Sequence, residues 1–300
     1  MGEVAEHRFV GLDALNVVTT LLQRRRLAHP TRGTFQAAEI QFWWSIPRST
    51  DDAAQLVWLD REGQPVAAVT VTDFGDGSSL VYEEPTLVVL VLPDATDDWV
   101  AHVLERGLAH VAGLGIEAVE IEVERNDDAQ RRVLFDRGFE VKGAGTVECW
   151  LDASVRPAMS RLADGYRIVS RADTAGQPHH LADEGREYID QRLNELSLYR
   201  PDLDLFAVDA DGDVAAYGIF WFDPTTETGV VEPMRTHEPH RGRGLARHIL
   251  TAGADALAQA GAKRIALAYE PDNPVSGPLY RSAGFVPTNQ SDVLAGPTTP

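Results

Sequence analysis

The stretch from Val230 to Ile249, VVEPMRTHEPHRGRGLARHI, decides the interpretation of this chain. Its apolar start predicts a strand that ends near His237, and a short loop with the sequence RGRG follows at 241–244. An amphipathic helix is expected directly after this loop. Glycines let a backbone approach a phosphate closely, while the free N–H groups and the positive dipole end of a helix favour an anion. The stretch therefore predicts an anion-binding loop.

A second informative segment lies downstream, where residues 273–285 read NPVSGPLYRSAGF after a buried-type strand RIALAY at 264–269. The spacing Arg241-x-x-Gly244-x-Ala246 resembles the [QR]-x-x-G-x-[GA] pyrophosphate signature of the GNAT superfamily of acyl-CoA N-acyltransferases. The downstream segment is similar to that superfamily's N-x-x-(A)-x-x-LY-x-x-x-GF segment. The resemblance covers residues 165 to 288, which is nearly all of the second half.

The resemblance implies acetyl-CoA as a cosubstrate and no metal. It implies that the pyrophosphate lies on the amides of residues 241–246, and that pantetheine lies between the strand before His237 and the strand 264–269. The residues that it implies in cofactor binding are Met234, Arg235, Thr236, Arg241, Gly242, Arg243, Gly244, Leu245, Ala246, Asn273 and Tyr280.

Acyl transfer to an amine needs a base for the ammonium proton and benefits from an acid for the departing thiolate. Tyr280 matches the family's phenol position next to the coenzyme A thiol and is the expected acid, although it could instead pack a short helix onto the sheet. Glu232, on the strand before the loop, is the leading base. The other candidates for the base are Glu270, His237 and Glu238.

The strand that carries Glu232 has an unusual residue next to it. By alternation, Val230, Glu232, Met234 and Thr236 are expected to share one face. Pro233 removes a ladder donor, so it predicts a β-bulge that would shift this facing by one residue.

The two halves of the chain repeat one pattern. Residues 57–71, VWLDREGQPVAAVTV, and 206–220, FAVDADGDVAAYGIF, each predict a β-hairpin, and a helix, a buried strand and a Gly-Phe pair follow both. This repetition predicts an α+β fold with two tandem GNAT-like domains, each a central mixed β-sheet flanked by helices. The expected limits are 1–151 for the first domain, 152–164 for a linker and 165–300 for the second, with a polar tail from Pro287 that frays.

The first half keeps this framework without the residues of the loop. Ala95, Asp97, Asp98 and Val100 occupy the places of Arg241, Arg243, Gly244 and Ala246. Two aspartates suit a helix N-terminus but would repel a pyrophosphate. We therefore expect a degenerate first copy and an active second copy, an architecture similar to that of the mycothiol synthase family.

Composition limits the classes of partner. The 300 residues carry a net charge of −19, which disfavours nucleic acid and anionic membrane surfaces. The single cysteine, Cys149, excludes a disulfide framework and a multi-cysteine metal site. No stretch reaches the roughly 20 apolar residues of a membrane span. We expect a cytoplasmic protein.

Two polar patterns are set aside as sites at this stage. His179-His180 has no supporting motif. The stretch Asp209-x-Asp211-x-Asp213 begins like a calcium loop, but its glycine is misplaced and no glutamate follows at the required spacing, so a hairpin turn explains it better. A helical run with Tyr188, Leu193, Leu196 and Tyr199 fits either an acceptor pocket or a core.

The sequence thus predicts an N-acetyltransferase that moves an acetyl group from acetyl-CoA to an amine by direct attack on the thioester. The alternative is a non-catalytic acyl-CoA-binding or regulatory protein of the same fold. The acceptor stays open between a small-molecule amine and a peptide amine, and the acyl chain and oligomeric state are also left open.

Overall fold

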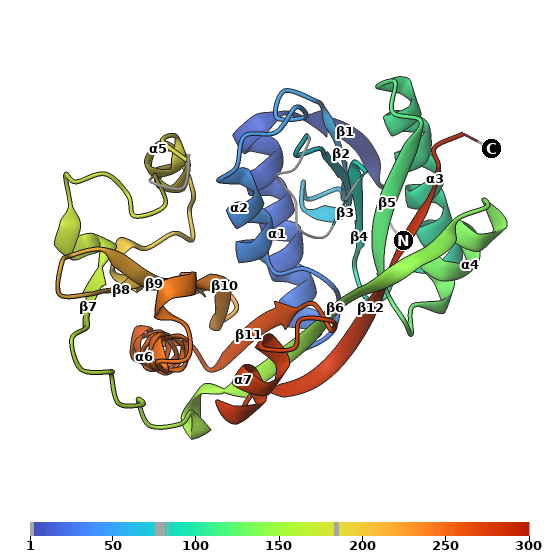
Figure 1. Cartoon of the computed structure of the whole chain (residues 1–300). Coiled ribbons are helices and arrows are strands. Elements are labelled where there is room, and N and C mark those ends of the chain that lie inside the picture. Colours follow the sequence, from blue (N-terminus) through green and yellow to red (C-terminus); the bar gives the residue numbers. More distant parts are fainter. Residues whose placement is uncertain (1–2, 76–81, 83, 183–185, 300) are drawn as a thin grey trace. The chain divides into compact units, whose positions relative to one another are not determined.

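A computed structural model describes residues 3–75, 82, 84–182 and 186–299 (Figure 1). The chain divides into two compact units. The first contains residues 1–40, 46–147 and 289–300, and the second contains 41–45 and 148–288. No helix in the described part of the chain is both long and apolar enough to cross a membrane.

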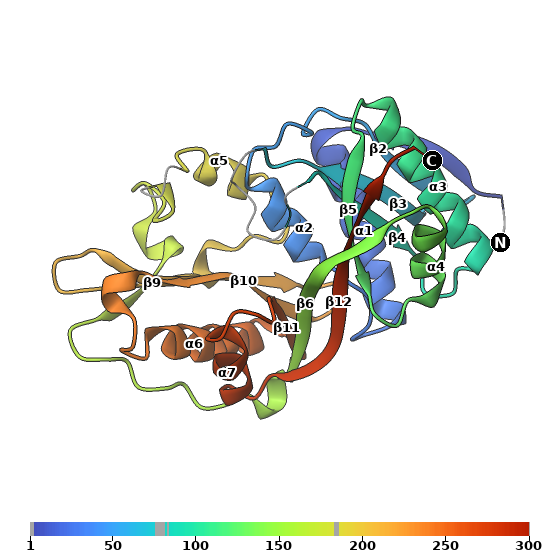
Figure 2. The same ribbon diagram turned by 45° about the vertical axis from the view of Figure 1, so that its right-hand side comes forward.

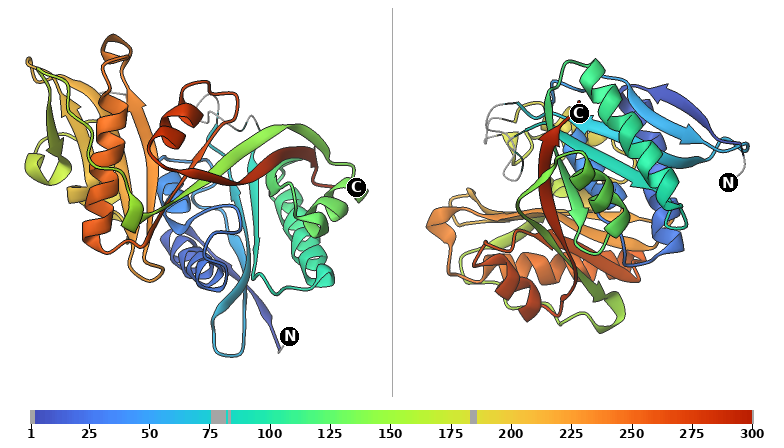
Figure 3. Two further views of the ribbon diagram at one scale, coloured as in Figure 1. Left: turned by 90° about the horizontal axis from the view of Figure 1, so that it is seen from below. Right: turned by 90° about the vertical axis from the view of Figure 1, so that its right-hand side faces the viewer.

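The first unit is a mixed sheet with helices on both faces. Its strands lie in the order β1 (Ala5–Phe9), β2 (Gln55–Leu59), β3 (Pro65–Thr72), β4 (Thr86–Val91), β5 (Ala118–Glu124) and β12 (Val286–Pro297). Helix α1 (Gly11–Ala28) covers one face, while α3 (Asp97–Gly113) and α4 (Asp128–Asp136) cover the other (Figure 3). The apolar side of α3 packs on this sheet because Val103, Leu104, Leu108 and Val111 recur at helical spacing and are all buried.

The second unit repeats this plan. Its strands lie in the order β11 (Arg264–Tyr269), β10 (Thr228–Thr236), β9 (Val214–Asp223), β8 (Asp204–Val208) and β7 (Arg167–Ser170). Helices α6 (Leu245–Ala260) and α7 (Ser276–Ser282) lie on one side of β9 and β10, and α5 (Ile189–Asn194) lies on the other (Figure 2). Short 3-10 turns occupy Ala153–Val155, Arg171–Thr174, Pro201–Leu203 and Glu238–His240.

Both predicted hairpins are present. Strands β2 and β3 pair antiparallel, as do β8 and β9. The acidic stretch forms the second hairpin's turn, because the Asp209 carboxylate accepts the amides of Asp211 and Asp213, each at 3.0 Å. The α+β class and the tandem arrangement of mixed sheets are confirmed.

The contact units differ from the expected limits at the C-terminal end. The segment from Pro287, which was expected to fray, continues strand β12, and its residues from Asn289 onward belong to the first unit. The register with β5 runs from Ser291 opposite Glu124 to Pro297 opposite Ala118. The β12 residues opposite the three glutamates of β5 are uncharged, namely Ser291, Val293 and Ala295, so no like charges meet across this pair of strands.

The linker expected at 152–164 is part of the second unit. Arg156 forms an ion pair of 2.7 Å with Asp255 on α6, and the amide of Ser160 donates to Thr251 on the same helix. This segment therefore packs along α6.

A second exchange involves helix α2 (Ala37–Trp44). Its last residues, from Gln41, together with Ser45, belong to the second unit, although they come from the first half of the chain.

Candidate active site

The strands that flank the predicted loop separate in the second unit. Strands β10 and β11 pair in parallel from Thr228 opposite Arg264 to Val230 opposite Ala266. Among the described residues, their paired register ends there, although β10 continues to Thr236 and β11 to Tyr269. The edge of β10 beyond Val230 therefore has backbone groups that β11 does not use, and these can pair with an extended ligand.

A β-bulge lies at this separation, as Pro233 predicted. The register with β9 shifts between Val231 and Met234, and the bulge contains the cis Glu232–Pro233 peptide bond. The expected common face is therefore wrong. Val230 lies opposite Trp221, and Met234 lies opposite Gly218. Since Trp221 and Gly218 are three positions apart on β9, they point to opposite faces of the sheet, and so do Val230 and Met234.

Glu232, in this bulge, has the electrostatics of a base that works near neutral pH. Burial, helped by the negative charge of Glu270, raises the pKa of Glu232 to about 7. Burial first and then Asp272 raise the pKa of Glu270 as well. A raised pKa makes the carboxylate form of each group a stronger base toward an ammonium group. A base with a pKa near the working pH is the most effective.

Tyr280, on α7, lies within electrostatic reach of Glu232. Its ring centroid is 5.8 Å from that of Tyr269 and 6.3 Å from that of Phe285. Burial, and after it electrostatic repulsion chiefly from Glu232, raises the pKa of Tyr280 well above its ordinary value. The phenol therefore keeps its proton in the neutral range, as a group that is to donate a proton must.

The predicted loop leads into α6 with open backbone. Gly242 and Gly244 have φ values of 75° and 79°, in the left-handed region, and a Cβ added at either would meet nothing within 4 Å. Gly244 is the N-cap and no side chain caps the helix, so its first amides are available to an anion. The Arg243 guanidinium lies 5.9 Å from the ring centroid of Tyr166, and Arg241 is exposed beside it.

The second unit is similar to a known family in its sequence. The sequence profile of the Acetyltransferase (GNAT) family matches residues 164–285. This segment is similar to that family over nearly the whole of the second unit. No curated protein matches the sequence.

Solved structures extend the fold to the whole chain. A tandem GNAT protein from the clavulanic acid biosynthesis pathway is 14% identical, with a TM-score of 0.70 and 99% coverage of both chains. A GCN5-related N-acetyltransferase from Sphaerobacter thermophilus is 15% identical, with a TM-score of 0.64 and coverage of 99% of this chain and 96% of that one. At these identities the likeness shows the fold alone, and this chain has the tandem GNAT fold. The match of residues 164–285 to the GNAT family model supports acyl transfer as the general class of reaction.

The remaining predicted cofactor residues lie at the end of β10, at the start of α6 and just before α7. Met234, Arg235 and Thr236 end β10, and the Thr236 hydroxyl is buried with no hydrogen-bond partner among the described residues. Leu245 is buried in the first turn of α6, next to Ala246. Asn273 is exposed, and its side chain accepts the amides of Val275 and Ser276 at the start of α7. A direct contact of these residues with a cofactor stays a prediction.

The alternative bases have other surroundings. Glu238 is exposed in a 3-10 turn. The amide of His237 donates to the Ala215 carbonyl, and its ring lies 6.1 Å from that of Tyr217. Glu270 remains close enough to Glu232 to affect its pKa.

The possible acceptor residues of the helical run are mostly structural. Leu193 and Leu196 are buried in the core. The Tyr199 hydroxyl donates to the carboxylate of Asp204 at 2.8 Å, and its ring packs beside Trp221. Core packing therefore explains this part of the run.

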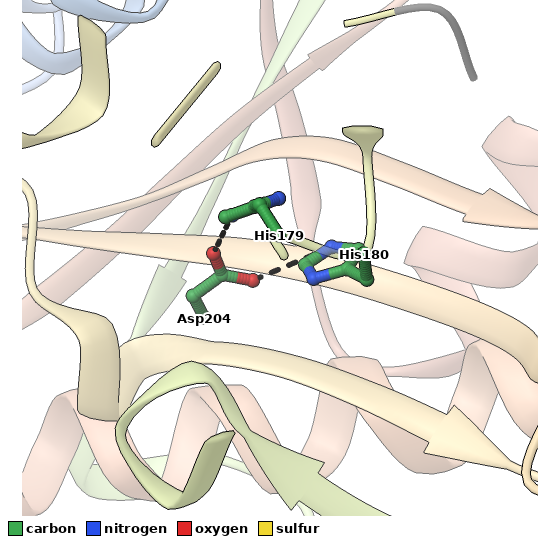
Figure 4. Close-up of side chains that lie close together, drawn as sticks. All are labelled: His179, His180 and Asp204. Carbon is green, nitrogen blue, oxygen red and sulfur yellow. Dashed lines mark hydrogen bonds and ion pairs between the residues drawn. The ribbon is translucent and has the colours of Figure 1, made fainter. Parts of the chain in front are cut away.

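The histidine pair that was set aside forms a buried cluster with Asp204 (Figure 4). The donor atoms of His179, His180 and Asp204 all lie within 4.8 Å of one another. His179 Nδ1 accepts the amide of Leu181, so its Nε2 carries the proton and donates it to Asp204 at 2.8 Å. A metal at this Nε2 would break that arrangement, and the cluster instead anchors the helical region to β8. The absence of a metal cofactor stays a prediction.

The first unit has a different helix start at the equivalent place. Thr96 caps α3, with its side chain accepting the amide of Trp99, and Asp97 and Asp98 fill the first turn. In place of a phenol, Leu134 is fully buried and Phe135 is exposed. The start of α3 therefore offers neither the open amides nor the positive charge that suit a pyrophosphate.

Sequence reasoning missed one group at the site. The Trp221 indole donates from Nε1 to the backbone carbonyl of Glu232 at 2.6 Å. In the sequence, Trp221 looks like any aromatic residue on a buried strand, and only the bulge brings its indole to a carbonyl.

Proposed function

We propose that the second unit is an N-acetyltransferase that moves the acetyl group of acetyl-CoA to an amine by direct attack. Two features next to each other in the chain carry the proposal. Strands β10 and β11 separate after Val230, and helix α6 begins at Gly244 with no side-chain cap and with open space around its glycines. Coenzyme A would place its pyrophosphate on the amides of 241–246 and its pantetheine along β10.

In the proposed reaction, Glu232 removes a proton from the acceptor ammonium, directly or through water. The free amine attacks the thioester carbonyl carbon, a C–N bond forms, and the C–S bond breaks as the tetrahedral intermediate collapses. Tyr280 gives its proton to the departing thiolate, and the second proton that the nitrogen loses as the amide forms returns the phenolate to the phenol, while Glu232 releases its proton to solvent. The raised pKa of Glu232 favours its role as the base, and the raised pKa of Tyr280 keeps the phenol protonated before the transfer.

A thiol-release assay with acetyl-CoA over a set of small-molecule and peptide amines tests the activity. Turnover with at least one amine is the expected result. Binding of CoA without turnover of any amine would instead indicate the non-catalytic alternative.

Replacement of the phenol tests the acid. Tyr280→Phe removes only the hydroxyl, so kcat is expected to fall by about 100-fold while the Kd for CoA stays within about twofold. Steady-state kinetics and calorimetry give the two numbers. Tyr269→Phe is the matched control because its ring lies beside Tyr280, and kcat that fell equally in both variants would count against the assignment.

A further inference from the structure

The bulge that carries Glu232 is not paired with β9. Between Val231 and Met234 the register with β9 shifts, so Glu232 and Pro233 have no opposite residue there. A carbonyl that has left the ladder needs another donor or it stays unsatisfied. The Trp221 indole N–H supplies that donor at 2.6 Å.

Trp221 is itself fixed from two sides. Its side chain is fully buried, and the edges of two rings meet it, with centroid distances of 5.8 Å to Tyr199 and 6.4 Å to Phe42. The Tyr199 hydroxyl donates a hydrogen bond to the fully buried carboxylate of Asp204, which also accepts a hydrogen bond from His179. The indole therefore has little freedom to rotate away from the Glu232 carbonyl.

Phe42 belongs to a segment that comes from the first half of the chain. Gln41 is fully buried, donates to the Ser197 hydroxyl at 2.9 Å and accepts the amide of Leu198 at 3.0 Å. Trp44 donates from its indole to Glu195 at 2.9 Å. Residues 41–45 thus hold the run 195–198, which leads directly into Tyr199.

These contacts form one continuous series from Gln41 to the bulge. We propose that Trp221 and Phe42 are positioning residues of the acyl-transfer site: Trp221 fixes the Glu232 bulge, and the segment 41–45 fixes Trp221. The inference rests on the proposed role of Glu232. It gives the first half of the chain a part in the activity of the second unit without any cofactor bound in the first.

Variants of the full chain test the series through kinetics. Trp221→Phe keeps an aromatic ring and removes the N–H, so kcat is expected to fall about tenfold with the Kd for CoA within about twofold. A double-mutant cycle with Glu232→Gln identifies the route of the effect. Because Trp221 acts through Glu232, Trp221→Phe is expected to change kcat by less than about twofold in that background.

The matched control is Trp58→Phe, a buried tryptophan of the first unit, which is expected to leave kcat unchanged. An effect of Trp221→Phe that persists in full when Glu232 is already glutamine would overturn the positioning role. If Glu232→Gln were fully active while wild type turns over amines, the assignment of the base would be wrong and the acetyltransferase function would stand.

A second readout does not depend on turnover. The chain has six tryptophans, so 15N-tryptophan labelling gives six indole N–H signals, and the signal lost in Trp221→Phe belongs to Trp221. Its hydrogen exchange is expected to be slow in wild type and at least about tenfold faster in Phe42→Leu and Gln41→Leu. Unchanged exchange in both folded variants would show that the segment 41–45 does not fix Trp221, whatever the outcome for the enzyme.

Discussion

Glu232 combines partial burial with a nearby like charge, and this sets the pH range in which it can act. Its pKa is raised to about 7, and only the deprotonated form is a base. We therefore expect kcat/KM for the acceptor to rise with pH up to about 7 and to level off above it. Glu232→Gln should lower kcat/KM by about 100-fold at pH 8 and remove this step from the pH-rate profile.

Comparison of variant and wild type on the same amine cancels the titration of the amine itself. Glu238→Gln is a suitable control, since Glu238 is an exposed carboxylate in the turn after β10. If the step near pH 7 disappeared in Glu238→Gln and persisted in Glu232→Gln, the base would be Glu238.

His180 makes a separate prediction about stability in acid. Its ring is stacked with those of His179 and Phe206 and lies tilted beside that of Tyr217, and burial lowers the pKa of His180 to about 4. The unfolded chain therefore binds more protons than the folded one between pH 4 and about 6.5, so this contribution to stability is present above pH 6.5 and is lost as the pH falls. From pH 7 to pH 5 the loss is about 2 kcal/mol of unfolding free energy.

His180→Phe keeps the stacking and removes the titration, so the variant should lose about 2 kcal/mol less than wild type over this pH interval. Urea unfolding at pH 5 and pH 7 measures the two differences. The exposed His29, changed to Phe, provides the control. An equal loss in wild type and His180→Phe would contradict the assignment of a buried neutral imidazole.

At the scale of elements, the start of α6 should respond to charge more than to shape. Gly244 is in the left-handed region, which asparagine and aspartate both tolerate better than other residues. Gly244→Asn tests the side chain alone, and Gly244→Asp adds a negative charge beside the proposed pyrophosphate. We expect a loss in CoA affinity of about tenfold or less for Asn and of at least about 100-fold for Asp.

Calorimetry with CoA measures both affinities, and thermal melting without CoA shows whether each variant remains folded. Equal affinities in Gly244→Asn and Gly244→Asp would place the pyrophosphate away from this helix start.

Local patterns in the sequence were sufficient to predict the hairpins, helices α3 and α6, and the loop before α6. Each of these depends on residues that are close in the chain, such as the glycines at 242 and 244 or the apolar spacing along α3. The bulge could be predicted from Pro233, but its length could not, so the facing of Met234 was wrong. The pairing of β12 with β5 and the docking of residues 41–45 could not be predicted, because a strand or helix pattern does not specify a distant partner.

For the whole molecule, the difference between the two helix starts predicts one coenzyme A per chain. In the first unit Thr96 already uses the amide of Trp99, and Asp97 and Asp98 would repel a pyrophosphate. Calorimetry should therefore give a stoichiometry near one. A value near two, or binding that persists in full in Gly244→Asp, would contradict a degenerate first unit.

The exchange of segments between the units also sets an order for synthesis. Glu124, at the end of β5, accepts a hydrogen bond from Asn289, which is synthesised 165 residues later. Gln41 donates to Ser197, which is synthesised 156 residues later. Until β12 is translated, the nascent first unit carries β5 with one edge open, and such an edge is a template for wrong pairing. A chain that ended at Thr288 would thus contain every residue of the second unit together with a first unit whose β5 edge is still open.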